Sequence, residues 1–154
     1  MLRELSPEGS RAISLAGIGG AGIQGPAMLT FGNAAVDAVR ICEAEKACPD
    51  DGWLRAVAMA FPSSKSMRDK SCPRAAFLGL CEQGLVKGIR AGKYTRSLKN
   101  KVYAVAAVSK LRKNSGLEDR PQALWKAVMN GKTKTHNEQM VVVIALWKAG
   151  LICD

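Results

Sequence analysis

The chain has 154 residues, which is enough to build one domain with a hydrophobic core and is a poor fit to two. Hydrophobic residues make up 47% of it, so disorder along the whole chain is excluded, and no apolar run reaches the length of about 18 residues that a membrane-spanning helix needs. With 23 Lys and Arg against 13 Asp and Glu, the formal net charge is +10, which favours polyanionic partners.

The positive charge is concentrated in the middle of the sequence. Residues 1–60 hold five basic and seven acidic side chains, residues 61–136 hold seventeen and four, and residues 137–154 hold one and two. A block of this kind creates a field that attracts nucleic acid, acidic lipid headgroups or an acidic protein, although an ordinary solvated surface has the same composition. Of these partners, we expect nucleic acid.

Five cysteines at irregular spacing and a single histidine, His136, argue against a disulfide scaffold or a metal site. The odd number suits a reducing, cytoplasmic setting in which most thiols act as small apolar side chains. The intervals between successive cysteines are not those of zinc sites. We therefore expect no metal and no cofactor.

The sequence begins with a glycine-rich stretch that includes AGIGGAGIQGP at residues 16–26. It contains G-x-G-x-x-G, the pattern of a dinucleotide-binding loop, but the Gly-Pro pair that follows falls where the required helix should be established. The rest of the chain offers no alternation of strands and helices from which to build a parallel sheet. We expect residues 1–27 to form a flexible leader and residues 28–154 to form a single domain that is mainly α-helical, with about six helices.

Three helices are predicted in the first part of this domain, at residues 33–47, 53–61 and 72–83. Asn33 is the expected N-cap of the first, and Ser71 is the expected N-cap of the third. A polar, basic loop over residues 62–71 joins the second to the third. Gly84 is the expected stop of the third helix, since glycine is common just after a helix end.

The third predicted helix is followed by two short β-capable pieces, which predict a small hairpin over residues 85–96. A helix, then Gly-Leu-Val, then a basic hairpin resembles the recognition helix and wing of winged helix-turn-helix domains. The resemblance implies that the helix enters the major groove of DNA and that the hairpin lies against the backbone. On this basis Arg68, Lys70 and Arg74 stand at the start of the groove helix, and the wing carries Lys87, Arg90, Lys93 and Arg96.

Three more helices are predicted at residues 97–113, 120–130 and 136–149. Asp119 with Gln122, and Thr135 with Glu138, fit the capping-box pattern at the starts of the last two. The final helix is apolar nearly all round, so we expect it at the centre of the fold. Its end, VIALWKAGLI, echoes FLGLCEQGLV at residues 77–86, and we interpret the echo as two helix stops that use the same chemistry.

The long helix over residues 97–113 has a basic side and an apolar side. At 100° per residue, Lys99, Lys110 and Lys113 fall within about 100° of one another, and we expect the valines and leucines to cover the other side. We expect a non-catalytic nucleic-acid-binding surface, with DNA favoured over RNA, where loops 65–74, 93–101 and 132–136 converge. The candidate contact residues are Lys65, Arg68, Lys70, Arg74, Lys93, Arg96, Lys99, Lys110, Lys113, Lys132, Lys134 and His136.

Two other functions stay open. The same charges suit an interaction module that docks on an acidic protein or self-associates. A small enzyme would use Cys72, which follows the predicted start of a helix and has Lys70 and Arg74 beside it, with His136 as its base. No orienting Asp or Asn is evident and no glycine-rich oxyanion turn adjoins, so a structural cysteine is the simpler interpretation.

Overall fold

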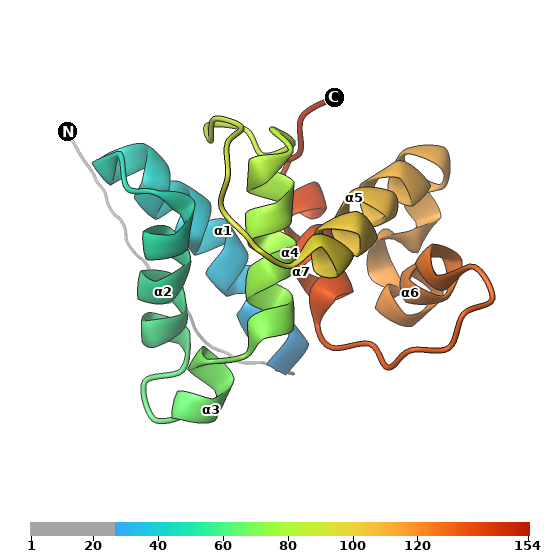
Figure 1. Ribbon diagram of the computed structural model, residues 1–154, viewed down its shortest axis with the longest axis horizontal. Helices are drawn as coiled ribbons and strands as arrows, with labels where there is room; N and C mark the ends of the chain where they lie inside the picture. The colour runs from blue at the N-terminus through green and yellow to red at the C-terminus, as the bar shows by residue number, and fades with distance from the viewer. Residues whose placement is uncertain (1–26) are drawn as a thin grey trace.

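The computed structural model describes residues 27–154, and Figure 1 shows them as a bundle of helices. The first half of the bundle (residues 27–86) contains α1 (Ala27–Glu45), α2 (Pro49–Ala60), the short α3 (Lys65–Arg68) and α4 (Ser71–Glu82). The second half (residues 98–153) contains α5 (Leu98–Lys113), the 3₁₀ helix η1 (Ser115–Asp119), α6 (Pro121–Met129) and α7 (Gln139–Lys148). The glycine-rich stretch and nearly all of the predicted leader lie outside the described residues.

Helices α1 and α2 pack closely because small residues line their contact. The buried side of α1 carries Ala34, Ala35 and Ala38. Gly52 of α2 lies against it, and a Cβ atom at this position would stand 2.6 Å from Cys42 Sγ and 2.9 Å from the Ala38 carbonyl oxygen. This close approach explains a glycine inside a helix, where it costs up to about 1 kcal/mol relative to alanine.

Helix α4 is the buried centre of the first half. All residues from Ala75 to Cys81 are buried. Helix α5 crosses α4 at Gly79, where an added Cβ atom would stand 2.7 Å from Lys101 Cα. Because α4 is enclosed in this way, it does not present the recognition surface that the winged helix-turn-helix resemblance implied.

Helices α4 and α7 end in the same way and are joined just beyond their ends. Gly84 and Gly150 follow them with φ of +78° and +73°, in the left-handed region that glycine adopts without strain. The amide after each glycine donates a 3.0 Å hydrogen bond to a carbonyl of its own helix. Val86 and Ile152 then form an antiparallel β-bridge with each other. The two echoing segments are therefore partners in space.

The similarity between the halves extends to their other long helices, since α1 and α2 correspond to α5 and α6 as α4 corresponds to α7. Helices α1 and α5 bury the same Ala-x-x-Ala-Val pattern, at residues 35–39 and 104–108. Helices α2 and α6 each begin with a proline and carry a buried tryptophan four positions later, Trp53 and Trp125. One continuous core joins the halves, as expected for a single domain that is mainly α-helical. No helix in the part of the chain that the structure describes has the length and apolar character needed to cross a membrane.

The hairpin predicted over residues 85–96 does not form. In the described structure this segment is irregular chain whose β-pairing is limited to the isolated bridge of Val86 with Ile152. Between the β-capable pieces lie Arg90, Ala91 and Gly92, and Gly88 lies within the first piece, so few cross-strand side chains are available to hold a register. The basic wing of the predicted DNA-binding unit is consequently absent as a hairpin.

Glu82, at the end of α4, fixes this irregular segment instead. Its two carboxylate oxygens accept a 2.7 Å hydrogen bond from Lys101 Nζ and a 2.8 Å bond from the Tyr94 amide, together with a 3.2 Å bond from the Thr95 amide. The Lys101 ammonium and the two amides lower the pKa of Glu82 to about 2. The ionised carboxylate therefore anchors the chain directly before α5.

Several helix starts differ from the predicted ones. Helix α1 begins at Ala27, so Asn33 lies in its interior rather than at its cap. Helix α2 begins four residues early, at Pro49, since proline is well suited to a first helical turn. Ser71 is the first residue of α4 rather than its N-cap, and neither α6 nor α7 begins with a side-chain cap of the capping-box kind.

Candidate functional site

Three loops that are far apart in the sequence meet where α4, α5 and α7 begin. Cys72 Sγ accepts hydrogen bonds from Asn137 Nδ2 at 3.5 Å and from Asn100 Nδ2 at 3.9 Å. The fully buried Gln139 closes the group, since its Nε2 donates to Asn100 Oδ1 at 3.0 Å. These contacts join residues of segments 65–74 and 93–101 to Asn137, which directly follows segment 132–136, and three helix N-termini bring their partial positive charges to one region.

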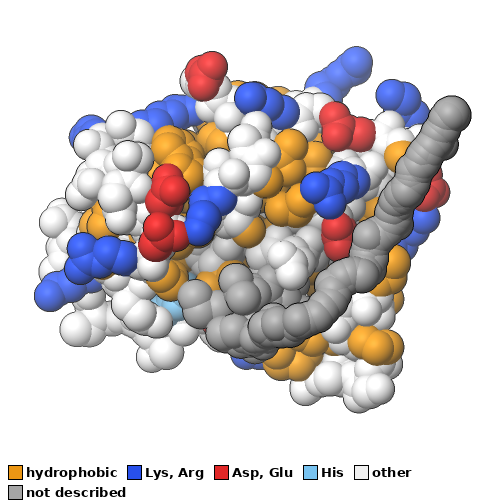
Figure 2. Space-filling model, turned by 180° about the vertical axis from the view of Figure 1, so that it is seen from behind, with side chains coloured by type: hydrophobic (Ala, Val, Ile, Leu, Met, Phe, Trp, Pro, Cys, Tyr) orange, Lys and Arg blue, Asp and Glu red, His pale blue; other side chains and the backbone are white. Residues whose placement is uncertain are grey.

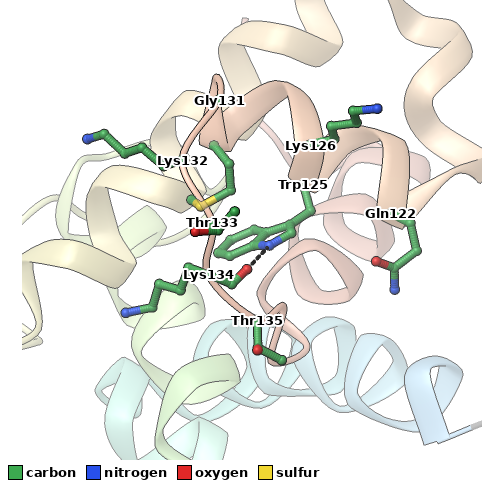
Figure 3. A pocket seen from close by; sticks show the side chains of 9 residues that line it. Gln122, Trp125, Lys126, Gly131, Lys132, Thr133, Lys134 and Thr135 are labelled. Atoms are coloured by element: carbon green, nitrogen blue, oxygen red, sulfur yellow. Dashed lines mark hydrogen bonds between the residues drawn. The ribbon is translucent and has the colours of Figure 1, made fainter.

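A hollow of about 760 Å³ adjoins this region, between α6 and the loop that leads to α7 (Figure 3). Trp125 and Met129, both nearly buried, form its floor. Its remaining lining is polar or cationic and includes no carboxylate among the described residues: Gln122, Lys126, Gly131, Lys132, Thr133, Lys134 and Thr135. The hollow therefore presents hydroxyl, amide and ammonium groups to a ligand.

Trp125 holds the loop that forms one wall of the hollow. Its indole Nε1 donates a 2.8 Å hydrogen bond to the Lys134 carbonyl, drawn as a dashed line in Figure 3. Tyr103 of α5 packs edge-on against the indole with ring centroids 5.3 Å apart, and Lys134 Nζ lies 5.7 Å from the Tyr103 centroid. Gly131 begins the loop with φ of +89°, which allows the chain to turn back after α6.

His136 caps α7 instead of serving as a surface cation. Its Nε2 accepts a 3.0 Å hydrogen bond from the Met140 amide, and its ring lies 5.3 Å from that of Trp125. Burial lowers the pKa of His136, so the imidazole is neutral at pH 7. His136 therefore adds no positive charge to the surface, because the nitrogen that faces the helix must stay unprotonated to accept the bond.

The candidate cations of the first half are mostly committed to partners within the protein. Lys65 pairs with Asp69 at 2.5 Å, and Arg74 binds Asp50 Oδ1 through two nitrogens at 2.9 and 2.5 Å. Arg68 donates to two backbone carbonyls just after α2. Lys70, which precedes α4, has no carboxylate partner among the described residues.

The candidate cations of the second half and of the segment before it are unpaired. None of them forms an ion pair with a carboxylate of residues 27–154, and all but the half-buried Lys110 are exposed: Lys93, Arg96, Lys99, Lys110, Lys113, Lys132 and Lys134. Residues 27–86 hold seven basic and seven acidic side chains, whereas residues 87–154 hold fourteen and four. Figure 2 shows the back of the molecule, where acidic side chains are interspersed among the basic ones.

Of the residues that line the hollow, only Lys132 and Lys134 were among the predicted contact residues. Lys126 is the one basic residue of α6. The sequence pattern of this helix does not reveal that Lys132 and Lys134 line the same hollow. Thr133 and Thr135 lie in the loop GKTKTHN, whose basic and hydroxyl-rich composition is a signal for anion binding that could have found them.

The pairing that a cysteine enzyme would need is not formed. Cys72 accepts hydrogen bonds from two asparagine amides, and the Nε2 of His136 is occupied by the Met140 amide. Among the described residues, no hydrogen bond joins the thiol to the imidazole.

The comparisons with known proteins place the chain in a family without giving it an activity. No curated protein and no solved structure matches the sequence. The sequence does match a family of unknown function, DUF6979, over residues 28–153. Because this match covers most of the chain, the protein belongs to the family DUF6979.

Proposed function

We propose that the protein is a non-catalytic nucleic-acid-binding protein and that it uses a basic face of the second half. This basic face consists of the lysines of the hollow and of the adjoining side of α5: Lys99, Lys110, Lys113, Lys126, Lys132 and Lys134. Lys99, Tyr103 and Lys110 lie on one side of α5 by helical periodicity, and Tyr103 contacts both Trp125 and Lys134. This side of α5 is therefore continuous with the hollow.

The observation that carries the proposal is the difference between two corresponding loops. In the first half, the connection between α2 and α4 is filled by α3, with Lys65 paired to Asp69 and Arg68 bound to carbonyls. In the second half, the connection between α6 and α7 stands open over a hollow whose three lysines form no ion pair with a carboxylate of residues 27–154. Lysines without carboxylate neighbours keep their charge available for phosphate groups, so this difference supports a polyanionic ligand.

Phosphate contacts of this kind predict a strong dependence of affinity on salt. Each neutralised phosphate releases condensed counterions, and the slope of log affinity against log salt is about −0.9 per phosphate on duplex DNA and about −0.7 on single strands. Anisotropy titrations of labelled single-stranded and duplex DNA across a salt series measure this slope. Absence of binding at low salt would overturn the proposal.

A matched pair of variants tests where the contacts lie. The double variant K132A/K134A removes two charges from the basic face, and R40A/K65A removes two exposed charges from the first half, so both have the same net charge. We expect the first to reduce the magnitude of the salt slope by between one and two and the second to leave it nearly unchanged. Equal losses would show a diffuse charge effect rather than a binding face.

An acidic protein would meet the same lysines, and the experiment separates the two partners. Nucleic acid bound to the protein from a cell extract is lost on treatment with nuclease. A partner that stays bound after this treatment, together with no affinity for purified DNA or RNA, would replace nucleic acid by an acidic protein.

A further inference from the structure

We propose that the nucleic acid is single-stranded and that the hollow seats one unstacked nucleotide of it. This inference rests on the proposed function and specifies its substrate class. The hollow, at about 760 Å³, lies in the range of pockets that enclose a small organic ligand, and it is larger than one phosphate group requires. A flat basic surface can bind the phosphate backbone of a nucleic acid, whereas a hollow also has room for a base and its sugar.

The arrangement of charge around the hollow fits a nucleoside with a phosphate on each side. Figure 3 shows Lys126 on the side of α6 and Lys132 and Lys134 on the side of the loop, with Trp125 between them. In a single strand, successive phosphates flank each nucleoside. A strand that crosses the hollow can place one phosphate near Lys126 and the next near Lys132 and Lys134, while the base between them points toward Trp125 and Met129.

The floor and walls supply contacts that suit a base. Trp125 and Met129, which are 6% and 5% exposed, provide a small apolar area that a base can contact irrespective of its identity. Gln122, Thr133 and Thr135 add an amide and two hydroxyl groups that can donate to or accept from the edge of a base. The half-buried ring of Tyr103 lies beneath Lys134, with Nζ 5.7 Å from the ring centroid.

A duplex does not use such a hollow. Its bases are paired and stacked inside the double helix, and only its phosphates and groove edges reach a protein surface. The two arginines that the winged helix-turn-helix resemblance placed at the start of the groove helix, Arg68 and Arg74, are held by backbone carbonyls and by Asp50. The lining of the hollow is therefore better suited to an unpaired, unstacked base of a single strand than to a duplex.

The test compares three labelled ligands on the full chain at one low salt concentration: a thymidine 12-mer, the same strand with abasic sites in place of its bases, and a hairpin duplex with the same number of phosphates. We expect the intact single strand to bind at least about fivefold more tightly than the abasic strand, because stacking and apolar contacts of the base are lost. We also expect it to bind more tightly than the duplex.

An uncharged pair of variants separates base contacts from phosphate contacts. Q122A/T133A removes an amide and a hydroxyl group from the hollow, and Q83A/S63A removes the same kinds of group from exposed positions of the first half. The first is expected to weaken binding of the intact strand at least about threefold and to leave the abasic strand unchanged, while the second changes neither. Thermal melting of each variant verifies that it is folded.

The outcomes distinguish this inference from the proposed function. Equal affinity for intact and abasic strands, or a preference for the duplex, overturns the seated nucleotide and leaves nucleic-acid binding in place. Absence of binding to all three ligands overturns both. Weaker binding of the abasic strand by Q122A/T133A would assign these side chains to the backbone and would also overturn the inference.

Discussion

The two halves of this protein share a plan of three helices but differ in what their charged side chains do. In the first half the basic and acidic residues are equal in number, and Lys65, Arg74 and Arg55 each contact a carboxylate. In the second half and the segment before it the basic residues exceed the acidic ones by ten, and most have no carboxylate partner among the described residues. The comparison shows that similar core positions accompany the similar helix arrangement, whereas the charged surface positions of the two halves differ.

Truncation of matched core leucines tests whether the halves contribute equally to stability. Leu80 of α4 and Leu146 of α7 are both fully buried and both lie four residues before the glycine that follows their helix. We expect Leu80→Ala and Leu146→Ala each to lower the free energy of unfolding by about 2–5 kcal/mol in urea titrations. Leu54→Ala, at a position 46% exposed, is the control and should cost far less.

A large difference between the two leucine variants would break the comparison. If one costs less than half as much as the other, the halves correspond in shape but not in energy. Different midpoints for fluorescence and circular dichroism in wild type would point the same way, because they would show that the halves unfold separately.

The glycine at the contact of α1 and α2 distinguishes the halves. Gly52 lies three positions after Pro49 at the start of α2, whereas the residue three positions after Pro121 at the start of α6 is the buried Leu124. In Gly52→Ala the new methyl group would stand 2.6 Å from Cys42 Sγ and 2.9 Å from the Ala38 carbonyl. We expect a loss of about 1–3 kcal/mol in unfolding free energy. Adding Cys42→Ala should recover part of it, since the sulfur is removed while the carbonyl stays; no recovery would place the strain on the backbone alone.

Acid titration is expected to affect the second half alone near neutral pH, since His136 is the one histidine of the chain. Burial lowers its pKa in the folded protein, so the unfolded chain binds more protons as the pH falls. The stability from this group is fully present above its unfolded pKa, near 6.5, and is lost as the pH falls through the lower folded value. Urea titrations at pH 7.5 and 5.5 measure this small loss, and His136→Gln should reduce it; an unchanged loss would assign it to carboxylates.

The sequence predicts the second half better than the first. Asn114 and Gly116 mark the end of α5, and Pro121 and Gly131 mark the ends of α6, so both helices lie within one residue of their expected bounds. The start of α7 is three residues late because His136 and Gln139 supply its cap contacts, and a histidine cap has no local signature. In the first half, α2 starts early because Gly52 reads as a helix breaker until its contact with α1 is known.

Of the candidate site, the sequence predicts which loops are basic but not which cations are free. Arg74 and Asp50 are 24 positions apart, and no local pattern brings them together. The meeting of the three loops depends on side-chain amides of Asn100, Asn137 and Gln139, which look like ordinary polar residues in the sequence. Long-range pairing is thus the part that only the folded structure supplies.

The antiparallel bridge of Val86 with Ile152 gives each half a hold on the other through two backbone amides. Lys87 N–H donates to the Leu151 carbonyl and Cys153 N–H to the Leu85 carbonyl, both at 2.8 Å. Since each proton is protected only while the halves stay together, exchange of these two with deuterated solvent reports any opening between them. Equal exchange rates for the Lys87 and Cys153 amides would mean that the two hydrogen bonds of the bridge open together, even when the helices remain intact.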